Sequence, residues 1–167
     1  MKRGNILTDF SYSYRINPKE LEILTGFSRE VPVKVGALAG ALGLRVVLAT
    51  LPMNISGLIQ PAEDGGFVIK VNRFEPKERQ RFTIAHEIAH FILHRDKIQA
   101  GLVDSVLYRS KLSSRLEAEA NRLAADIIMP KEAVIAAMQE MQGGDEGVDA
   151  LAQRFQVSRQ AMEIRVS

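Results

Sequence analysis

Cysteine is absent from this chain of 167 residues. Its absence excludes a disulfide framework, a thiol nucleophile and any metal site that depends on thiolate ligands. A metal ion in this protein must therefore be held by histidine and carboxylate side chains, which are the other common zinc ligands. Histidine is scarce as well, with three residues in the chain.

Long apolar runs are also missing. No stretch approaches the roughly 18 apolar residues of a membrane-spanning helix. Lys2 and Arg3 are not followed by the apolar run of a secretory signal. We therefore expect a cytoplasmic protein with no membrane partner. The net charge is only +2 and the basic residues are scattered, so charge alone makes direct nucleic-acid binding a weak expectation.

The length and the hydrophobic content of 46% suit a compact globular chain. Apolar periodicity and capping residues predict more helix than strand. Helices are expected at 17–24, 33–42, 76–94, 116–129, 130–141, 148–156 and 158–166, and strands at 45–51, 54–60 and 67–72. No firm period appears in 95–114, and the glycine-rich segment 143–147 reads as a flexible joint. The pattern predicts an α+β fold whose small sheet packs on a long helix and whose C-terminal half is mainly helical.

The most informative segment is His86-Glu87-Ile88-Ala89-His90. Residues four apart on a helix share a face and are separated by about 6 Å along the axis. Two imidazoles at that spacing can hold one metal ion, and Glu87 can then act as general base on a water molecule. The alternative is that both histidines are ordinary core residues. The flanking residues are almost all apolar, so burying these polar groups without a metal costs several kcal/mol, roughly, and we favour the metal site.

A catalytic zinc site needs a third protein ligand and an open position. Glu117 and Glu119 are the candidates. On a helix, Glu117 shares a largely apolar side, whereas Glu119 shares a side with the charged residues Arg115, Arg122 and Asp126. Because a ligand must face inward, we choose Glu117 and keep Glu119 as the alternative.

Two further residues are candidates for supporting the ligands. Asn121 follows Glu117 by one turn and can orient a ligand histidine through a hydrogen bond, although a plain surface amide is the alternative reading. His94 lies two turns after His86, about 12 Å away on a straight helix, which is too far for both to bind one ion. We expect His94 near the C-terminus of its helix, in a supporting role.

The chain resembles the ImmA/IrrE-type metallopeptidase family over roughly residues 33–165. The resemblance is carried by Arg81-Phe82-Thr83-Ile84-Ala85-His86-Glu87-Ile88-Ala89-His90, His94, Glu117-Ala118-Glu119-Ala120-Asn121, Ile127-Ile128-Met129-Pro130, residues 40–44 and Phe155-Gln156-Val157-Ser158. It implies a zincin core that holds Zn²⁺ through two histidines and one glutamate. It also implies cleavage or inactivation of an XRE-type helix-turn-helix repressor, in mobile elements or stress responses. Ala89 departs from the glycine that is more frequent in the family, and we expect no loss because alanine is small.

This reading predicts a zincin-like metallopeptidase domain over 1–147 and a helix-turn-helix-like cap over 148–167. The mechanism expected is zinc-dependent hydrolysis of a peptide bond with Glu87 as general base. The predicted strand 67–72 immediately precedes the motif helix. It can therefore take up an extended substrate along its edge, or it can be a plain core strand.

Two other functions fit the same sequence. Residues 150–162 look like a helix-turn-helix, which suggests a DNA-binding regulator, although Gln156 stands where a turn glycine is often useful. We prefer a cap that packs on the core. A metal-binding interaction protein without peptidase activity is the second alternative. Zinc is the preferred ion because it tolerates a tetrahedral site, but another divalent ion can bind such ligands.

Overall fold

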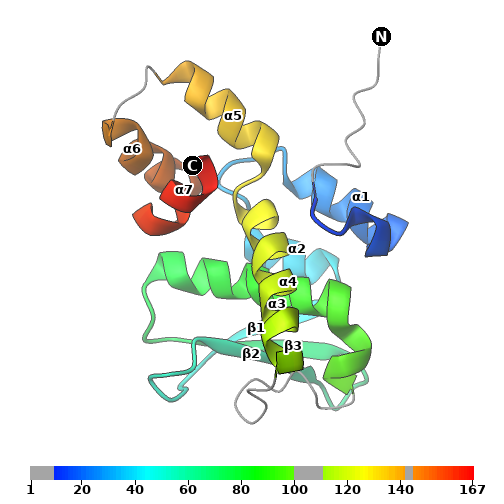
Figure 1. The fold of residues 1–167 in the computed structure, drawn as a ribbon. Coiled ribbons are helices and arrows are strands. Elements are labelled where there is room, and N and C mark those ends of the chain that lie inside the picture. The colour runs from blue at the N-terminus through cyan, green and yellow to red at the C-terminus, as the bar shows by residue number, and fades with distance from the viewer. Residues whose placement is uncertain (1–9, 100–110, 142–144) are drawn as a thin grey trace.

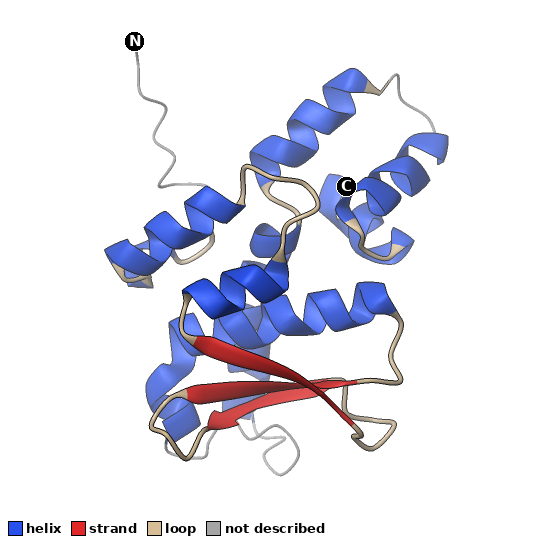
Figure 2. Ribbon diagram, turned by 180° about the vertical axis from the view of Figure 1, so that it is seen from behind, coloured by secondary structure: helices blue, strands red, loops and turns tan. Residues whose placement is uncertain are grey.

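The computed structural model of the chain describes residues 10–99, 111–141 and 145–167. It has an α+β fold in which helices lie to one side of a small sheet (Figures 1 and 2), as the sequence predicts. The elements in chain order are a 3-10 helix η2 (Ser13–Arg15), α1 (Pro18–Phe27), α2 (Val35–Ala41), β1 (Leu44–Ala49), β2 (Gly57–Pro61), β3 (Phe67–Asn72), α3 (Lys77–Gln99), α4 (Lys111–Ile128), α5 (Lys131–Glu140), α6 (Asp145–Phe155) and α7 (Arg159–Val166). No helix in the described part of the chain is both long and apolar enough to cross a bilayer.

The sheet has three strands in the order β1-β3-β2. β3 pairs in parallel with β1 and antiparallel with β2, so that Ile69 stands between Val46 and Ile59. β3 is therefore the central strand, with both edges already hydrogen-bonded. Of the two readings of strand 67–72, the plain core strand is the one found, because substrate addition needs an unpaired edge.

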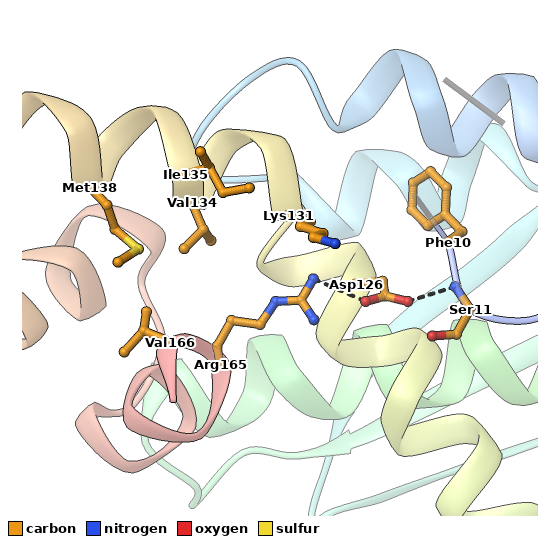
Figure 3. A pocket seen from close by; sticks show the side chains of 9 residues that line it. All are labelled: Phe10, Ser11, Asp126, Lys131, Val134, Ile135, Met138, Arg165 and Val166. Atoms are coloured by element: carbon orange, nitrogen blue, oxygen red, sulfur yellow. Dashed lines mark hydrogen bonds and ion pairs between the residues drawn. The ribbon is translucent and has the colours of Figure 1, made fainter. Parts of the chain in front are cut away.

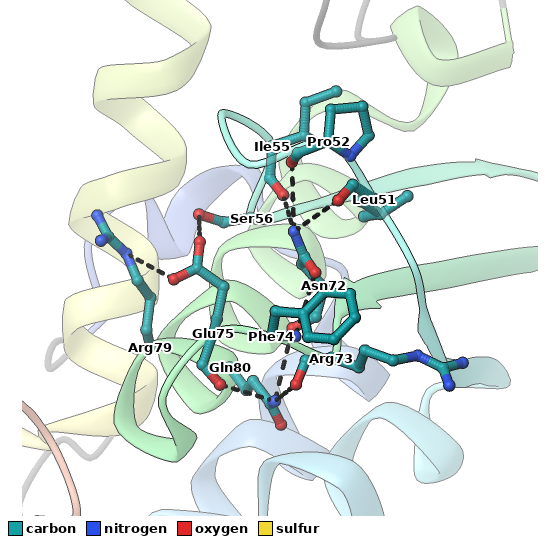
Figure 4. Close-up of polar contacts among 10 residues, drawn as sticks. All are labelled: Leu51, Pro52, Ile55, Ser56, Asn72, Arg73, Phe74, Glu75, Arg79 and Gln80. Carbon is teal, nitrogen blue, oxygen red and sulfur yellow. Dashed lines mark hydrogen bonds and ion pairs between the residues drawn. The ribbon is translucent and has the colours of Figure 1, made fainter.

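A buried amide fixes the end of β3 against the loops around it (Figure 4). Asn72 is 2% exposed. Its Nδ2 donates to the carbonyls of Leu51, Pro52 and Ile55 at 3.1, 3.3 and 3.0 Å, and its Oδ1 accepts from Phe74 N–H at 3.2 Å. One side chain thus satisfies backbone groups on both the β1–β2 loop and the β3–α3 connection, which sets where α3 begins.

The helix α3 carries the histidine motif across the sheet. Ala85, Ile88 and Ala89 are fully buried, and the Phe91 ring meets the Phe67 ring of β3 edge-on at 5.5 Å. The helix also contacts α2, α4 and β2. The sequence prediction of a largely buried motif helix is confirmed, because apolar groups on several sides of it pack against different elements.

Helix ends are where the structure differs most from the predictions. The helix α3 runs on to Gln99, with non-helical backbone at His94 (φ −130°, ψ 27°). The helix α4 begins at Lys111, before the predicted start, and α6 begins at Asp145, inside the predicted flexible joint. The residues between α3 and α4, 100–110, lie outside the described residues. These polar ends lack an apolar period, so the sequence pattern does not locate them.

The terminal segments meet at Asp126 of α4 (Figure 3). Its carboxylate accepts from Ser11 N–H at 2.7 Å and pairs with Arg165 of α7 at 3.0 Å. Arg165 Nε also donates to the carbonyl of Met129 at 3.0 Å. A cavity of about 520 Å³ lies beside this cluster. One buried carboxylate therefore ties the N-terminal segment and the last helix to α4.

The helices α6 and α7 form the turn that the sequence suggested. The Ser158 hydroxyl accepts from Ala161 N–H at 3.1 Å and caps α7. Gln156 adopts a left-handed conformation (φ 52°), where glycine is usually favoured. Arg81 of α3 donates to the carbonyls of Phe155 and Gln156 at 3.4 and 3.2 Å, so the turn packs on the motif helix. The division into 1–147 and 148–167 stays a prediction.

Candidate metal centre

Three potential ligands converge between α3 and α4. His86 and His90 are one helical turn apart on α3, and their ring centroids lie 4.7 Å apart. The neighbouring helix α4 brings Glu117 against both rings. One carboxylate oxygen lies 3.0 Å from His86 Nε2, and the other lies 2.8 Å from His90 Nε2. One ligand atom from each residue can be chosen so that all lie within 4.8 Å of one another.

The electrostatics of this cluster favour a positive charge among the three groups. Burial alone would lower the pKa of His86, but the hydrogen bond to Glu117 and the charges of Glu87 and Glu117 outweigh it and raise the pKa. Burial alone would raise the pKa of Glu117, yet both histidines hold it well below its usual range. Two imidazole nitrogens and one carboxylate are a common donor set for a catalytic zinc. The residues therefore fit such an ion.

The remaining ring nitrogens of both histidines have partners. His86 Nδ1–H donates to Asn121 Oδ1 at 2.8 Å. His90 Nδ1 lies 2.9 Å from Nδ1 of His94. Each Nε2 is thus left to face Glu117. The amide of Asn121 and the ring of His94, which the sequence proposed as supporting groups, both lie within hydrogen-bond distance of a candidate ligand.

His94 lies where the first regular stretch of α3 ends, as the sequence predicts, and a second helical stretch continues beyond the kink to Gln99. The His94 side chain is 1% exposed and its Nε2 lies 2.9 Å from a carboxylate oxygen of Glu119. Burial lowers the pKa of His94, and the hydrogen bond to Glu119 only partly opposes it. Burial therefore favours the neutral ring of His94 over the charged one.

Glu117 and Glu119 lie in environments opposite to those expected from the apolar side of the helix. The Glu117 side chain is 43% exposed, whereas that of Glu119 is only 16% exposed. Glu119 is covered by Arg15, whose Nη1 donates to it at 2.8 Å, so it is not part of the converging group. A ligand at a cleft must leave room for substrate and therefore faces solvent on one side. Arg15 had no signal in the sequence, because the first 16 residues show no period.

Glu87 lies beside the converging groups on α3. The residue is 5% exposed. Burial raises the pKa of its carboxyl, while the nearby rings of His86 and His90 oppose the shift and Glu117 adds to it. A carboxylate whose pKa is raised toward neutrality is a better proton acceptor near pH 7 than a solvated one.

Comparison with known proteins gives an independent result. The profile of the Peptidase_M78 family, described as the IrrE N-terminal-like domain, matches residues 39–167. The radiation response metalloprotease IrrE of Deinococcus radiodurans is 40% identical over 101 residues, which cover 57% of this chain and 30% of that protein. A solved structure of a Mycobacterium tuberculosis transcriptional regulator superposes with a TM-score of 0.57 at 18% identity, covering 90% of this chain and 48% of that one.

These similarities differ in what they establish. The low identity to the solved structure shows a shared fold alone. The chain spans less than half the length of either relative, so what those whole proteins do is not transferred here. The family profile, in contrast, covers most of the chain, including the candidate ligands on α3 and α4. The chain therefore belongs to the Peptidase_M78 family of IrrE N-terminal-like domains.

Proposed function

We propose that this protein is a cytoplasmic zinc-dependent endopeptidase that cleaves, and thereby inactivates, an XRE-type helix-turn-helix repressor. The observation that carries the peptidase assignment is the convergence of His86, His90 and Glu117 beside the buried carboxyl of Glu87. Membership of a metallopeptidase family supports the same reaction class. The repressor as substrate rests on the resemblance to ImmA/IrrE-type proteins.

In this mechanism His86, His90 and Glu117 would hold the metal. A bound zinc ion would supply Lewis acidity, which lowers the pKa of water and polarises the scissile carbonyl. Glu87 accepts the proton of the attacking water and passes it to the leaving nitrogen. Burial raises the pKa of this carboxyl and so favours proton uptake, while the neighbouring imidazoles oppose the shift.

The sheet offers a place for an extended substrate. Among the described residues, β2 pairs only with β3, which leaves its other edge for strand addition. It is also the edge strand that α3 contacts most extensively. We therefore propose that the substrate lies along β2, not along β3, with its scissile bond near Glu117, the exposed side of the cluster.

The test combines metal analysis with digestion of a purified repressor. Wild-type protein is expected to bind about one zinc ion and to cut an XRE-type repressor from the same genome, detected as fragments by mass spectrometry. His90→Ala should lose both properties. Glu87→Gln should keep the zinc and lose the cleavage, because the amide cannot accept the proton. Cleavage by Glu87→Gln at the wild-type rate would overturn the peptidase mechanism.

The two alternatives give different results in the same experiment. A non-cleaving interaction protein would release the repressor from its operator without producing fragments, and Glu87→Gln would act like wild type. A DNA-binding regulator would be retained on DNA in a salt-dependent way. We do not favour it, because Arg154 is paired with Glu140, and Arg159 is paired with Asp149 and Glu163. A carboxylate partner offsets the positive charge of an arginine and so weakens its attraction to DNA phosphates.

A further inference from the structure

A chain of polar contacts runs from the N-terminal segment to a candidate metal ligand. Arg15 Nη1 and Nη2 lie 2.8 and 3.4 Å from the two carboxylate oxygens of Glu119. Glu119 Oε1 lies 2.9 Å from His94 Nε2. His94 Nδ1 in turn lies 2.9 Å from His90 Nδ1. Both rings are almost fully buried, with side chains 2% and 1% exposed, so water has little access to the contact between them.

When both rings are neutral, the chemistry of the first member sets the direction of each bond in this chain. A guanidinium only donates, and an ionised carboxylate only accepts. His94 must therefore donate its Nε2–H to Glu119. A neutral imidazole has one N–H, so Nδ1 of His94 carries a lone pair and accepts from His90 Nδ1–H. In a neutral His90 the lone pair is then on Nε2, the atom that faces Glu117 and that would bind a metal.

We propose that Arg15 and Glu119 are positioning residues that select the tautomers of His94 and His90, and so present the Nε2 lone pair of His90 to the metal. This inference rests on the proposed metal site and deepens it. Metal-bound histidines commonly donate their other N–H to a carboxylate or carbonyl. Here a second histidine is inserted between the ligand and that carboxylate, and the guanidinium keeps the carboxylate ionised and in place.

Arg15 is held in position by its own segment. It ends the 3-10 helix η2, and Ser11 N–H just before that helix is bonded to Asp126 of α4. The guanidinium also lies over the Tyr12 ring, 5.3 Å from its centroid. These contacts hold the segment that carries Arg15 against α4. The residue precedes the family match, which begins at residue 39, so the matched region alone does not contain the whole chain of bonds.

A purely structural role for Arg15 is the competing explanation, since the ion pair also ties the N-terminal segment to α4. The chain offers a matched control for this. Glu20 of α1 pairs with Arg95 of α3. This pair ties the same N-terminal region to the core but is not part of the relay, the chain of polar contacts from Arg15 through Glu119 and His94 to His90. Glu20→Gln therefore removes a comparable tether and leaves Arg15, Glu119 and His94 unchanged.

The experiment uses the full chain and two readouts besides activity. Zinc affinity is measured by competition with a chromophoric chelator. Ring tautomers are measured by long-range ¹H–¹⁵N correlation, which is simple here because the chain has three histidines and all lie in this cluster. Wild type should show Nε2–H on His94 and, with zinc bound, Nδ1–H on His90. Arg15→Met and Glu119→Leu should mix the His94 tautomers and weaken zinc binding by about 10–100-fold.

Conservative and control variants complete the test. Arg15→Lys should recover most of the zinc affinity, because an ammonium still donates to Glu119. Glu20→Gln should match wild type in tautomers and affinity, even if its melting temperature falls. Equal zinc affinity and equal His94 tautomers in wild type, Arg15→Met and Glu119→Leu would overturn the relay while leaving the metal site intact. Failure of the wild-type protein to bind zinc would instead overturn the proposed function.

Discussion

At the scale of single residues, the candidate ligands depend on groups that hold their rings. His86 and His90 each use Nδ1 for a hydrogen bond, to Asn121 and to His94 respectively. Each bond fixes both the orientation of the ring and the nitrogen that carries the proton. The two supports differ in exposure, since Asn121 lies at the surface whereas His94 is buried.

Asn121 gives the residue-scale prediction. Asn121→Leu should weaken zinc binding by about 10-fold or more, with little change in unfolding temperature because the site is exposed. Asn121→Asp is the matched variant, since it keeps an acceptor for His86 Nδ1–H, and it should bind zinc nearly as tightly as wild type. Chelator competition measures both. Equal loss in the two variants would mean that the hydrogen bond is not what matters.

The residue scale also shows where sequence reasoning stops. The pair His86 and His90 could be predicted because helical geometry alone puts them on one face. Choosing between Glu117 and Glu119 from the apolar stripe assigned their environments the wrong way round, with 43% and 16% exposure observed. The choice assumed that a side chain on the apolar side of the helix is buried. A metal ligand in an open cleft is instead partly exposed to solvent. Arg15, distant in sequence, covers the other glutamate.

At the scale of elements, the position of the motif helix on the sheet depends on a close approach. Gly57 of β2 packs where an added Cβ would lie against the Thr83 methyl of α3 and 2.7 Å from the carbonyl oxygen of Lys70. A glycine at this point lets the two elements approach each other. The absence of a side chain at Gly57 therefore helps to set how closely the helix that carries both histidines lies to the sheet.

Replacing this glycine gives the first element-scale prediction. Gly57→Ala should lower the free energy of unfolding by about 2 kcal/mol, because backbone must move to admit the methyl group. Gly26→Ala in α1 is the control, since nothing lies within 4 Å of its added Cβ. It should be neutral or raise stability by about 0.5–1 kcal/mol. Urea unfolding measures both, and equal effects would contradict the packing argument.

The turn between α6 and α7 gives the second prediction at the scale of elements. Gln156 is exposed and left-handed, a conformation that costs a side-chain-bearing residue about 1–2 kcal/mol. Gln156→Gly should therefore stabilise the protein, by about 0.5–1 kcal/mol after the greater chain entropy of glycine is counted. Gln153→Gly, at an exposed position inside α6, should instead lose about 1 kcal/mol. Thermal melts should move in opposite directions.

Elements could be predicted as far as their local signals reach. The strand 67–72 is predicted between turn signals and is found at Phe67–Asn72. The extension of α3 to Gln99 and the early start of α4 fall where the sequence has no firm apolar period, so its pattern could not locate them. The strand order β1-β3-β2 could not be predicted either, because nothing local states which strands pair.

At the scale of the whole molecule, Asp126 joins parts that are far apart in sequence. Asp126→Ala would leave Arg165, whose side chain is 20% exposed, without its carboxylate, and it would free Ser11 N–H. We expect a loss of about 3 kcal/mol in unfolding free energy, because one partner of a mostly buried ion pair is left uncompensated. Differential scanning calorimetry measures it.

Glu140→Ala is the corresponding control. It breaks the pair with Arg154, in which both side chains are well exposed, at 63% and 43%. Such surface pairs contribute about 0–1 kcal/mol, so the melting temperature should hardly change. If the two variants were equally destabilised, burial of the Asp126 pair would not be the reason for its effect.

Because Arg15 contacts the histidine cluster through Glu119, it affects which segment of the chain must be transferred to keep the metal site complete. Sequence similarity marks out a segment that starts at residue 39, whereas the guanidinium that orders the buried rings comes from 24 positions earlier (39 − 15). A recombination event that moved only the similar segment would carry the candidate ligands. It would not carry the arginine that selects the tautomer of His90. Homologues with unrelated leading sequences must then solve that problem with another donor, or tolerate looser metal binding.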